Sequence, residues 1–162
     1  MISEQVQDYL TLVWKTRAPI LQKQSPAELV ASTLSRVLGD SVSDYAYVDF
    51  ASGAGGPTPL MERALNREIA ARNDDTETVK FVLTDLKPHP EAWKRLAKKS
   101  ENLGYIGEGV DAANAPKDLH RGVEGVQNKK VMRLFSLAFH HFDDELAARI
   151  LDNTAETADG FW

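Results

Sequence analysis

A glycine-rich turn between an apolar run and a helix constrains the fold of this chain more than any other feature. The run Tyr47–Phe50 leads into Ala51-Ser52-Gly53-Ala54-Gly55-Gly56-Pro57. Glycine lacks a Cβ, so this stretch can take positive φ and let a ligand approach the backbone, and Pro57 can begin a helix without losing a useful amide donor. The amides of that helix would face the ligand. The pattern predicts a ligand-binding crossing from strand to helix, and a plain tight turn is an equal alternative from this segment alone.

Composition narrows the class of protein. The chain has 162 residues, of which 43% are hydrophobic, and this is enough for one domain with a core. A net charge of -5 argues against a broad electrostatic surface for nucleic acid or an anionic membrane. The absence of cysteine excludes disulfides, thiolate metal sites and cysteine nucleophiles. Because the amino end lacks a signal pattern and no run reaches membrane-spanning length, we expect a cytoplasmic protein with a small-molecule ligand and no nucleic-acid or membrane partner.

Short apolar runs alternate with longer helical ones, a pattern typical of an α/β domain. Two helices are expected before the first strand: one from Ser3 to Gln22, and one that begins at a capping box of Ser25 and Glu28 and ends at Gly39. Strands are expected at 45–50, 79–83, 105–110 and 131–137, and further helices at 58–72, 90–99 and 143–153. Helical crossovers of this kind predict a mostly parallel sheet.

Acidic residues follow two of the expected strands, where ligands bind in open α/β sheets. Asp85 comes after the second strand, and its two oxygens suit the paired hydroxyls of a ribose, whereas a simple turn cap is the alternative. Asp111 comes after the third strand, where it could accept a hydrogen bond from an adenine amino group. The turn formers Asn114, Ala115 and Pro116 make a structural turn nearly as good an interpretation.

A cluster of polar residues follows the fourth expected strand in Phe139-His140-His141-Phe142-Asp143-Asp144-Glu145. His140 or His141 could remove a proton from an acceptor, or the pair could hold the loop by hydrogen bonds. Asp143 and Asp144 are expected to cap the next helix. Two adjacent histidines in an extended segment point apart, so no metal site is predicted.

Other polar residues are expected to be solvated. His89 and His120 stand alone in loop-like contexts, which predicts that they face solvent. A basic group belongs to the helix at 90–99 and consists of Lys94, Arg95, Lys98 and Lys99. An amphipathic helix places such residues outward, so this group is expected to form its solvated face.

From residue 44 to 162 the chain resembles the class I S-adenosylmethionine-dependent methyltransferases, and among them a poorly characterised microbial and fungal group. The matching pieces are Val48–Pro57, Val82–Pro88, Val110–Ala112 and Phe135–Phe142. Their order and spacing agree with the family. The resemblance implies a Rossmann-like fold at 44–162, an amino-terminal helical cap at 1–43 and S-adenosyl-L-methionine as cofactor.

The resemblance also implies roles for individual residues. The implied cofactor-binding residues are Asp49, Ala51, Ser52, Gly53, Gly55, Asp85, Leu86, Asp111, Ala112 and Phe135. In the family pattern, Asp49 and the loop at 53–56 would hold the aminoacyl part, Asp85 would hold the ribose, and Asp111 with Ala112 would recognise adenine.

Four further residues take roles by the same resemblance. His140 and His141 would lie beside the transferred methyl group as the catalytic candidates. Tyr9 and Trp14, on the first expected helix, would face the substrate. A tryptophan on the apolar face of a helix, as Trp14 is expected to be, is more often buried in the core than in contact with a substrate.

The chain departs from the family at two places. Ala51 stands where the family has the first glycine of its Asp-x-Gly-x-Gly-x-Gly turn, and its methyl group could crowd the cofactor. The family also continues through a complete fifth strand, so this sequence is expected to be a truncated methyltransferase that forms a homodimer or associates through an open sheet edge. The predicted function is methyl transfer to a small molecule, and the alternative is a catalytically inactive module that binds S-adenosylmethionine or a partner.

Overall fold

The computed structural model describes residues 24–72 and 77–162. The first expected helix, with Tyr9 and Trp14, and thus most of the expected cap at 1–43, lies outside the described residues. The elements in chain order are α2 (Pro26–Leu38), η1 (Gly39–Asp44), β1 (Tyr45–Asp49), α3 (Thr58–Arg72), β2 (Phe81–Leu83), α4 (Pro90–Ala97), β3 (Leu103–Tyr105), η2 (Leu119–Gly122), β4 (Lys130–Leu134), η3 (Phe139–His141), α5 (Asp144–Thr157) and β5 (Gly160–Phe161).

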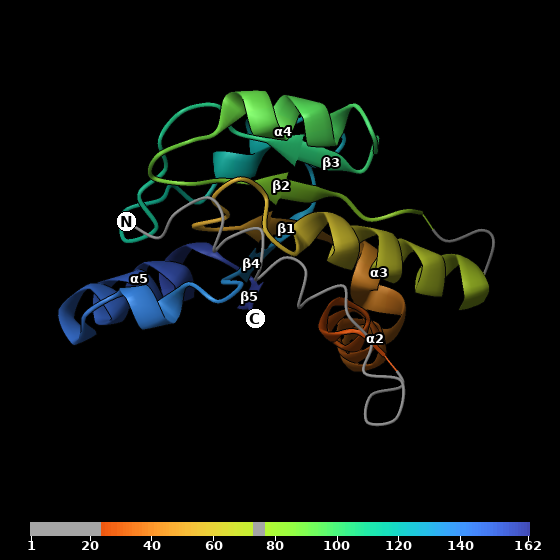
Figure 1. Ribbon diagram of the computed structural model, residues 1–162. Coiled ribbons are helices and arrows are strands. Elements are labelled where there is room, and N and C mark those ends of the chain that lie inside the picture. Colours follow the sequence, from red (N-terminus) through yellow and green to blue (C-terminus); the bar gives the residue numbers. More distant parts are fainter. Residues whose placement is uncertain (1–23, 73–76) are drawn as a thin grey trace.

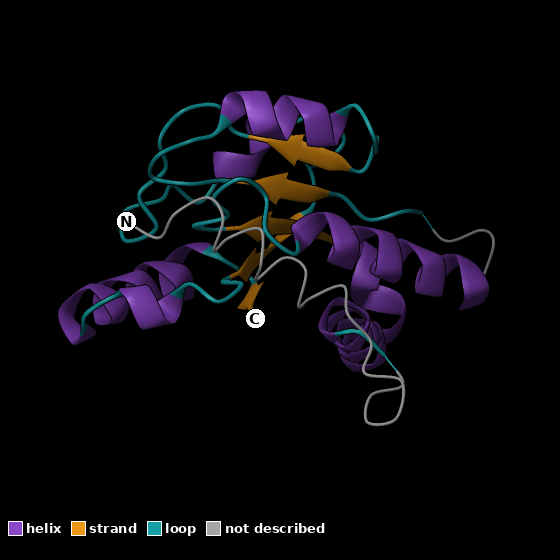
Figure 2. Cartoon of the chain, viewed as in Figure 1, coloured by secondary structure: helices purple, strands orange, loops and turns teal. Residues whose placement is uncertain are grey.

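Five parallel strands form one sheet in the order β3-β2-β1-β4-β5, with helices packed against it (Figures 1 and 2). The chain runs outward from β1 to β3 and then returns to place β4 on the other side of β1. The order therefore reverses between β1 and β4, and ligands of such sheets bind at this reversal. The α/β class with a parallel, Rossmann-like sheet is confirmed.

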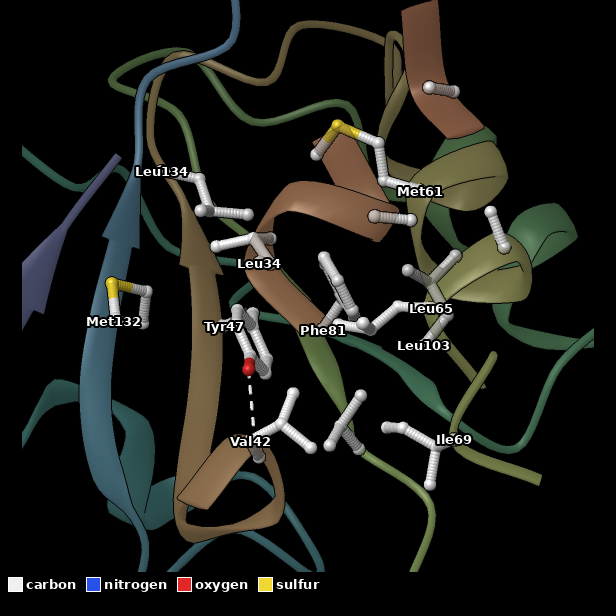
Figure 3. Packing of buried hydrophobic residues seen from close by; sticks show 14 of the residues in the cluster. Leu34, Val42, Tyr47, Met61, Leu65, Ile69, Phe81, Leu103, Met132 and Leu134 are labelled. Atoms are coloured by element: carbon white, nitrogen blue, oxygen red, sulfur yellow. Dashed lines mark hydrogen bonds between the residues drawn. The ribbon is translucent and has the colours of Figure 1, made fainter. Parts of the chain in front are cut away.

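Two apolar clusters lie on the two faces of the sheet. The larger one joins α2, α3 and α4 to side chains such as Tyr47, Phe81 and Leu134 (Figure 3). The Tyr47 hydroxyl is buried there and donates a 2.9 Å hydrogen bond to the Val42 carbonyl, which satisfies the one polar group of that side chain. The second cluster includes Val48 and Val82 with the segment between β3 and β4.

Several element boundaries agree with the sequence. Ser25 caps α2 through a complete capping box with Glu28, Pro26 opens that helix, and α3 has the predicted bounds. Asp143 caps α5 by accepting a 2.8 Å hydrogen bond from the Leu146 amide. Short-range capping chemistry is readable from sequence because it depends on residues three positions apart.

Two strand predictions were misplaced. β3 lies at Leu103–Tyr105 rather than 105–110, and it includes Gly104, where an added Cβ would lie 2.7 Å from the Val123 side chain. β4 ends at Leu134 rather than 137, since Leu137 adopts a left-handed backbone with φ of 58°. Both corrections come from tertiary packing or turn geometry, which hydrophobic periodicity does not encode.

β5 forms one edge of the described sheet. It pairs in parallel with β4, and the pairing extends to Trp162, whose amide donates a 2.8 Å hydrogen bond to the Arg133 carbonyl. Phe161 and Trp162 are 59% and 45% exposed. This edge thus combines strand backbone with two exposed aromatic side chains.

Candidate functional site

The glycine turn and Asp85 are joined directly. The Gly53 amide donates a 2.8 Å hydrogen bond to Asp85 Oδ2, and the Lys87 amide donates one of equal length to Oδ1. Ser52 fastens the same two segments, because its hydroxyl and its amide both donate to the Thr84 carbonyl. The loops after β1 and β2 therefore form one unit at the carboxyl ends of the two strands.

Asp49 lies at the base of this unit and is completely buried. Its Oδ2 accepts a 2.5 Å hydrogen bond from the Thr58 hydroxyl at the start of α3, while Oδ1 has no partner of proper hydrogen-bond geometry among the described residues. The pKa of Asp49 is raised to about 7, chiefly by burial and to a smaller extent by the carboxylate of Asp85, while the polar groups of Thr58 and Ser136 oppose this rise. The site thus contains a carboxyl group that titrates near neutrality.

The turn depends on unusual backbone conformations. Gly53, Gly55 and Gly56 all have positive φ, as the sequence predicted, and an added Cβ on Gly55 would collide with the Leu96 side chain. Ala51 also has positive φ, at 54°. Ala51 thus occupies a position whose backbone conformation favours glycine.

Changing Ala51 to glycine should raise the free energy of unfolding by about 1 kcal/mol, because a Cβ in the left-handed region is strained by that order and this side chain is exposed. Ala54→Gly is the matched control: Ala54 is exposed in the same turn but lacks a positive φ, so its change should lower the stability by roughly 0.5 to 1 kcal/mol. Urea unfolding of the three chains measures both effects. Equal losses in both variants would contradict the strain at Ala51.

The Trp93 side chain supports the glycine turn, a role that the sequence did not lead us to expect. Its side chain on α4 is fully buried, and its indole nitrogen donates a 2.8 Å hydrogen bond to the Gly53 carbonyl. A tryptophan on the apolar side of an otherwise basic helix was the available signal. The indole fixes the position of Gly53, whose amide is bonded to Asp85.

The segment after β3 closes the site on another side. The Val110 amide donates a 2.9 Å hydrogen bond to the Asp85 carbonyl, so the residues that follow it lie next to the unit formed by the first two loops. Asp111 is exposed and its Oδ1 accepts a 2.9 Å hydrogen bond from the Ala113 amide, which is the turn geometry considered as the alternative role. Ala112 is half-buried beside the second apolar cluster, and Leu86 is 63% exposed.

A chain of contacting aromatic rings connects the residue after β1 with η3, which contains the two histidines. Phe50 stacks on Phe135 with ring centroids 5.6 Å apart, and Phe135 contacts Phe139, the first residue of η3, at 5.0 Å. His140 and His141 follow in η3, both exposed, with ring centroids 3.8 Å apart. None of the contacts found within residues 24–72 and 77–162 joins either histidine to the glycine turn. The structure therefore brings Asp49, Gly53, Asp85 and Phe135 into one region and leaves the histidine pair at its margin.

Two predictions about isolated polar residues had different outcomes. His89 is exposed as expected, and so is the basic group on α4. His120 is only 5% exposed, so its predicted solvent position was wrong. It is buried because η2 folds back over the second face of the sheet and its Nε2 lies 3.1 Å from the Lys129 carbonyl, a contact that short-range sequence patterns do not reveal.

Within the described part of the chain, no helix is long and apolar enough to cross a membrane, and no group of three or more metal-ligating side chains comes together. Comparison with known proteins found no match among protein-family models, curated proteins or solved structures.

Proposed function

We propose that this protein binds S-adenosyl-L-methionine at the joined loops after β1 and β2 and transfers its methyl group to a small molecule. The observation that carries the proposal is the hydrogen bond between the Gly53 amide and Asp85 Oδ2. It holds a carboxylate against the glycine turn that follows β1, and the strand order of the sheet reverses between β1 and β4. Nucleoside ligands of such sheets are held there, with the acid after the second strand near the ribose.

The chemistry of Asp85 is compatible with a ribose. Each carboxylate oxygen already accepts one backbone amide, but each has a second lone pair that a ribose hydroxyl can use. The side chain is also only partly buried, so a ligand can reach it. Its two amide bonds hold the carboxylate in place before a ligand arrives, which lowers the entropic cost of binding.

The buried carboxyl group of Asp49 supports a ligand with positive charge. S-adenosyl-L-methionine carries a sulfonium and an ammonium group, and a cation near Asp49 would favour its ionised form and offset the cost of burial. Because Asp49 is fully buried, the ligand does not touch its carboxylate, and the attraction between the two charges acts through the glycine turn. Ligand affinity should therefore rise with pH as Asp49 loses its proton.

One observation favours the alternative of an inactive binding module. None of the contacts found within the described residues joins His140 or His141 to the glycine turn, so the two catalytic candidates lie at the margin of the region. Binding without transfer is consistent with that arrangement. Calorimetric titration with S-adenosyl-L-methionine tests binding, and mass spectrometry of methylated products in a small-molecule extract tests transfer.

Asp85→Ala should weaken adenosine binding by about 1 to 3 kcal/mol, which corresponds to roughly 5- to 150-fold, because ribose hydroxyls lose a partner. Asp85→Asn keeps an oxygen that accepts the Gly53 amide but removes the negative charge, so it distinguishes the effect of the charge from that of the loop contact. For 2′-deoxyadenosine, which lacks one hydroxyl of the ribose pair, both variants should lose less affinity relative to the parent than they lose for adenosine. Glu101→Ala, a change of an exposed acid just before β3, serves as control. Equal losses for both nucleosides would remove the ribose assignment.

Association through the edge at β5 is the second part of the proposal. Phe161 and Trp162 are exposed beside strand backbone, and such edges pair readily with another chain. We expect a homodimer in light scattering, with dissociation when both aromatics are changed to serine. Leu29→Ser removes an equally exposed apolar residue on α2 and should leave the dimer intact. A parent chain that stays monomeric at all concentrations would contradict association.

A further inference from the structure

Gly53 is bound on both sides by one short segment of the chain, residues 85–93. Its amide donates a 2.8 Å hydrogen bond to Asp85 Oδ2 at one end of that segment, and its carbonyl accepts a 2.8 Å hydrogen bond from the Trp93 indole at the other end. These two polar groups of Gly53 belong to successive peptide units, so the two bonds together restrain both φ and ψ of the glycine. We call residues 85–93 the Gly53 clamp.

The Gly53 clamp is stiff between its two points of contact. Pro88 and Pro90 fix the φ angle at two of its positions. The Lys87 amide donates a 2.8 Å hydrogen bond back to Asp85 Oδ1, and this bond restrains the carboxylate. Because α4 begins at Pro90, Trp93 lies in the first turn of a regular helix. The distance between the two contacts with Gly53 is therefore set by the clamp itself.

The core holds the Trp93 end of the clamp in place. The Trp93 side chain is fully buried in the larger apolar cluster, and its ring packs on Tyr105 of β3 with centroids 6.0 Å apart. Leu96 lies three positions further along α4, on the same face of the helix, and its side chain fills the space in which a Cβ on Gly55 would stand. Helix α4 thus contacts the glycine turn at two points, and both contacts depend on the core.

The indole N–H distinguishes Trp93 from an apolar residue that only fills space. A Phe side chain in the same place would also pack against Tyr105, but it has no donor for the Gly53 carbonyl. Loss of this donor would leave Gly53 restrained at its amide alone, where its partner is the Asp85 carboxylate.

We propose that Trp93 is a positioning residue of the ligand site: its indole fixes Gly53, and the Gly53 amide in turn keeps the Asp85 carboxylate in the orientation that the ligand meets. The effect on affinity rests on the proposed function, in which a ribose binds Asp85. A site that is ordered before the ligand arrives pays less entropy on binding. Removal of the indole donor should therefore weaken binding although Trp93 does not touch the ligand.

The first test needs no ligand. Replacement of Trp93 alone by 3-benzothienylalanine keeps the shape of the ring and puts sulfur in place of the N–H. Amide hydrogen exchange, followed by NMR, should become roughly 3- to 10-fold faster at Gly53, which corresponds to the loss of one hydrogen bond from the closed turn. Ile69→Val is the control, because Ile69 is buried near the other end of α3 and its change lowers global stability without touching the turn.

The exchange rates give a clear decision. In Ile69→Val the rate at Gly53 should stay at the parental value, because that amide exchanges through local opening of the turn. An unchanged rate at Gly53 in the sulfur analogue would overturn the proposal. Equal acceleration in the analogue and in Ile69→Val would do the same, since it would show that Trp93 acts only through global stability.

The second test measures the affinity for adenosine by calorimetric titration. The sulfur analogue should bind adenosine roughly 3- to 10-fold more weakly than the parent, and Ile69→Val should bind it as the parent does. Unchanged affinity in the analogue would overturn the positioning role even if exchange at Gly53 were faster. A parent chain that did not bind adenosine would instead contradict the proposed function, and the exchange rates would still decide whether Trp93 holds the turn.

Discussion

Asp49→Asn should make the protein more stable at pH 8 than the parent chain, by roughly 2 to 4 kcal/mol, and should change its stability little near pH 4. The cause is burial, which raises the pKa of Asp49 from 3.8 to about 7 in the folded chain. Below pH 3.8 the carboxyl group is neutral in both the folded and the unfolded chain, and its stabilising contribution is fully present. Between 3.8 and 7 the unfolded chain loses the proton first, so the stability of the parent falls as pH rises, by on the order of 4 kcal/mol in total.

Asparagine has the same shape and no charge, so it removes this pH dependence and can still bond to the Thr58 hydroxyl. Urea unfolding of both chains at pH 4, 5, 6, 7 and 8 gives the difference in free energy as a function of pH. Asp118→Asn, a change of an exposed aspartate, controls for the loss of one negative charge. A constant difference between parent and Asp49→Asn across this range would show that Asp49 is already ionised in the folded protein.

The second large effect is expected at the histidine pair. If His140 or His141 removes a proton from the methyl acceptor, its replacement by alanine should lower kcat by about 10²-fold or more while the affinity for S-adenosyl-L-methionine stays near the parental value. The other histidine of the pair serves as the matched control, since both are exposed and adjacent in η3. Steady-state rates and calorimetric titration of the two single variants separate catalysis from binding.

Two other results would contradict a catalytic role for these histidines. The two histidine rings contact one another, with their planes tilted by 43°, so each replacement also removes a ring contact. If both variants lost turnover in proportion to a loss of thermal stability, the pair would hold the loop rather than act on a proton. A variant with full turnover would exclude that histidine as the base.

Some features of the site were determined by the sequence alone, because they depend on residues close together in the chain. The glycine turn after β1, the capping of α2 by Ser25 and the extent of α3 are examples. The position of Asp85 directly after a strand also followed from local order, together with the rule that parallel strands end at one edge of the sheet. Short-range chemistry of this kind predicted the α/β class, which the parallel sheet confirms, whereas the ligand site at this edge stays a prediction.

Only the tertiary structure decided which polar groups are buried and how burial changes their pKa values and hydrogen bonds. The raised pKa of Asp49 comes from its complete burial, and the hydrogen bond from Trp93 to Gly53 joins residues 40 positions apart. The burial of Arg133 and His120 likewise required η2 and α5 to pack over one face of the sheet. Desolvation depends on all the atoms that surround a group, and most of those atoms belong to residues distant in the sequence, so a local pattern cannot encode it.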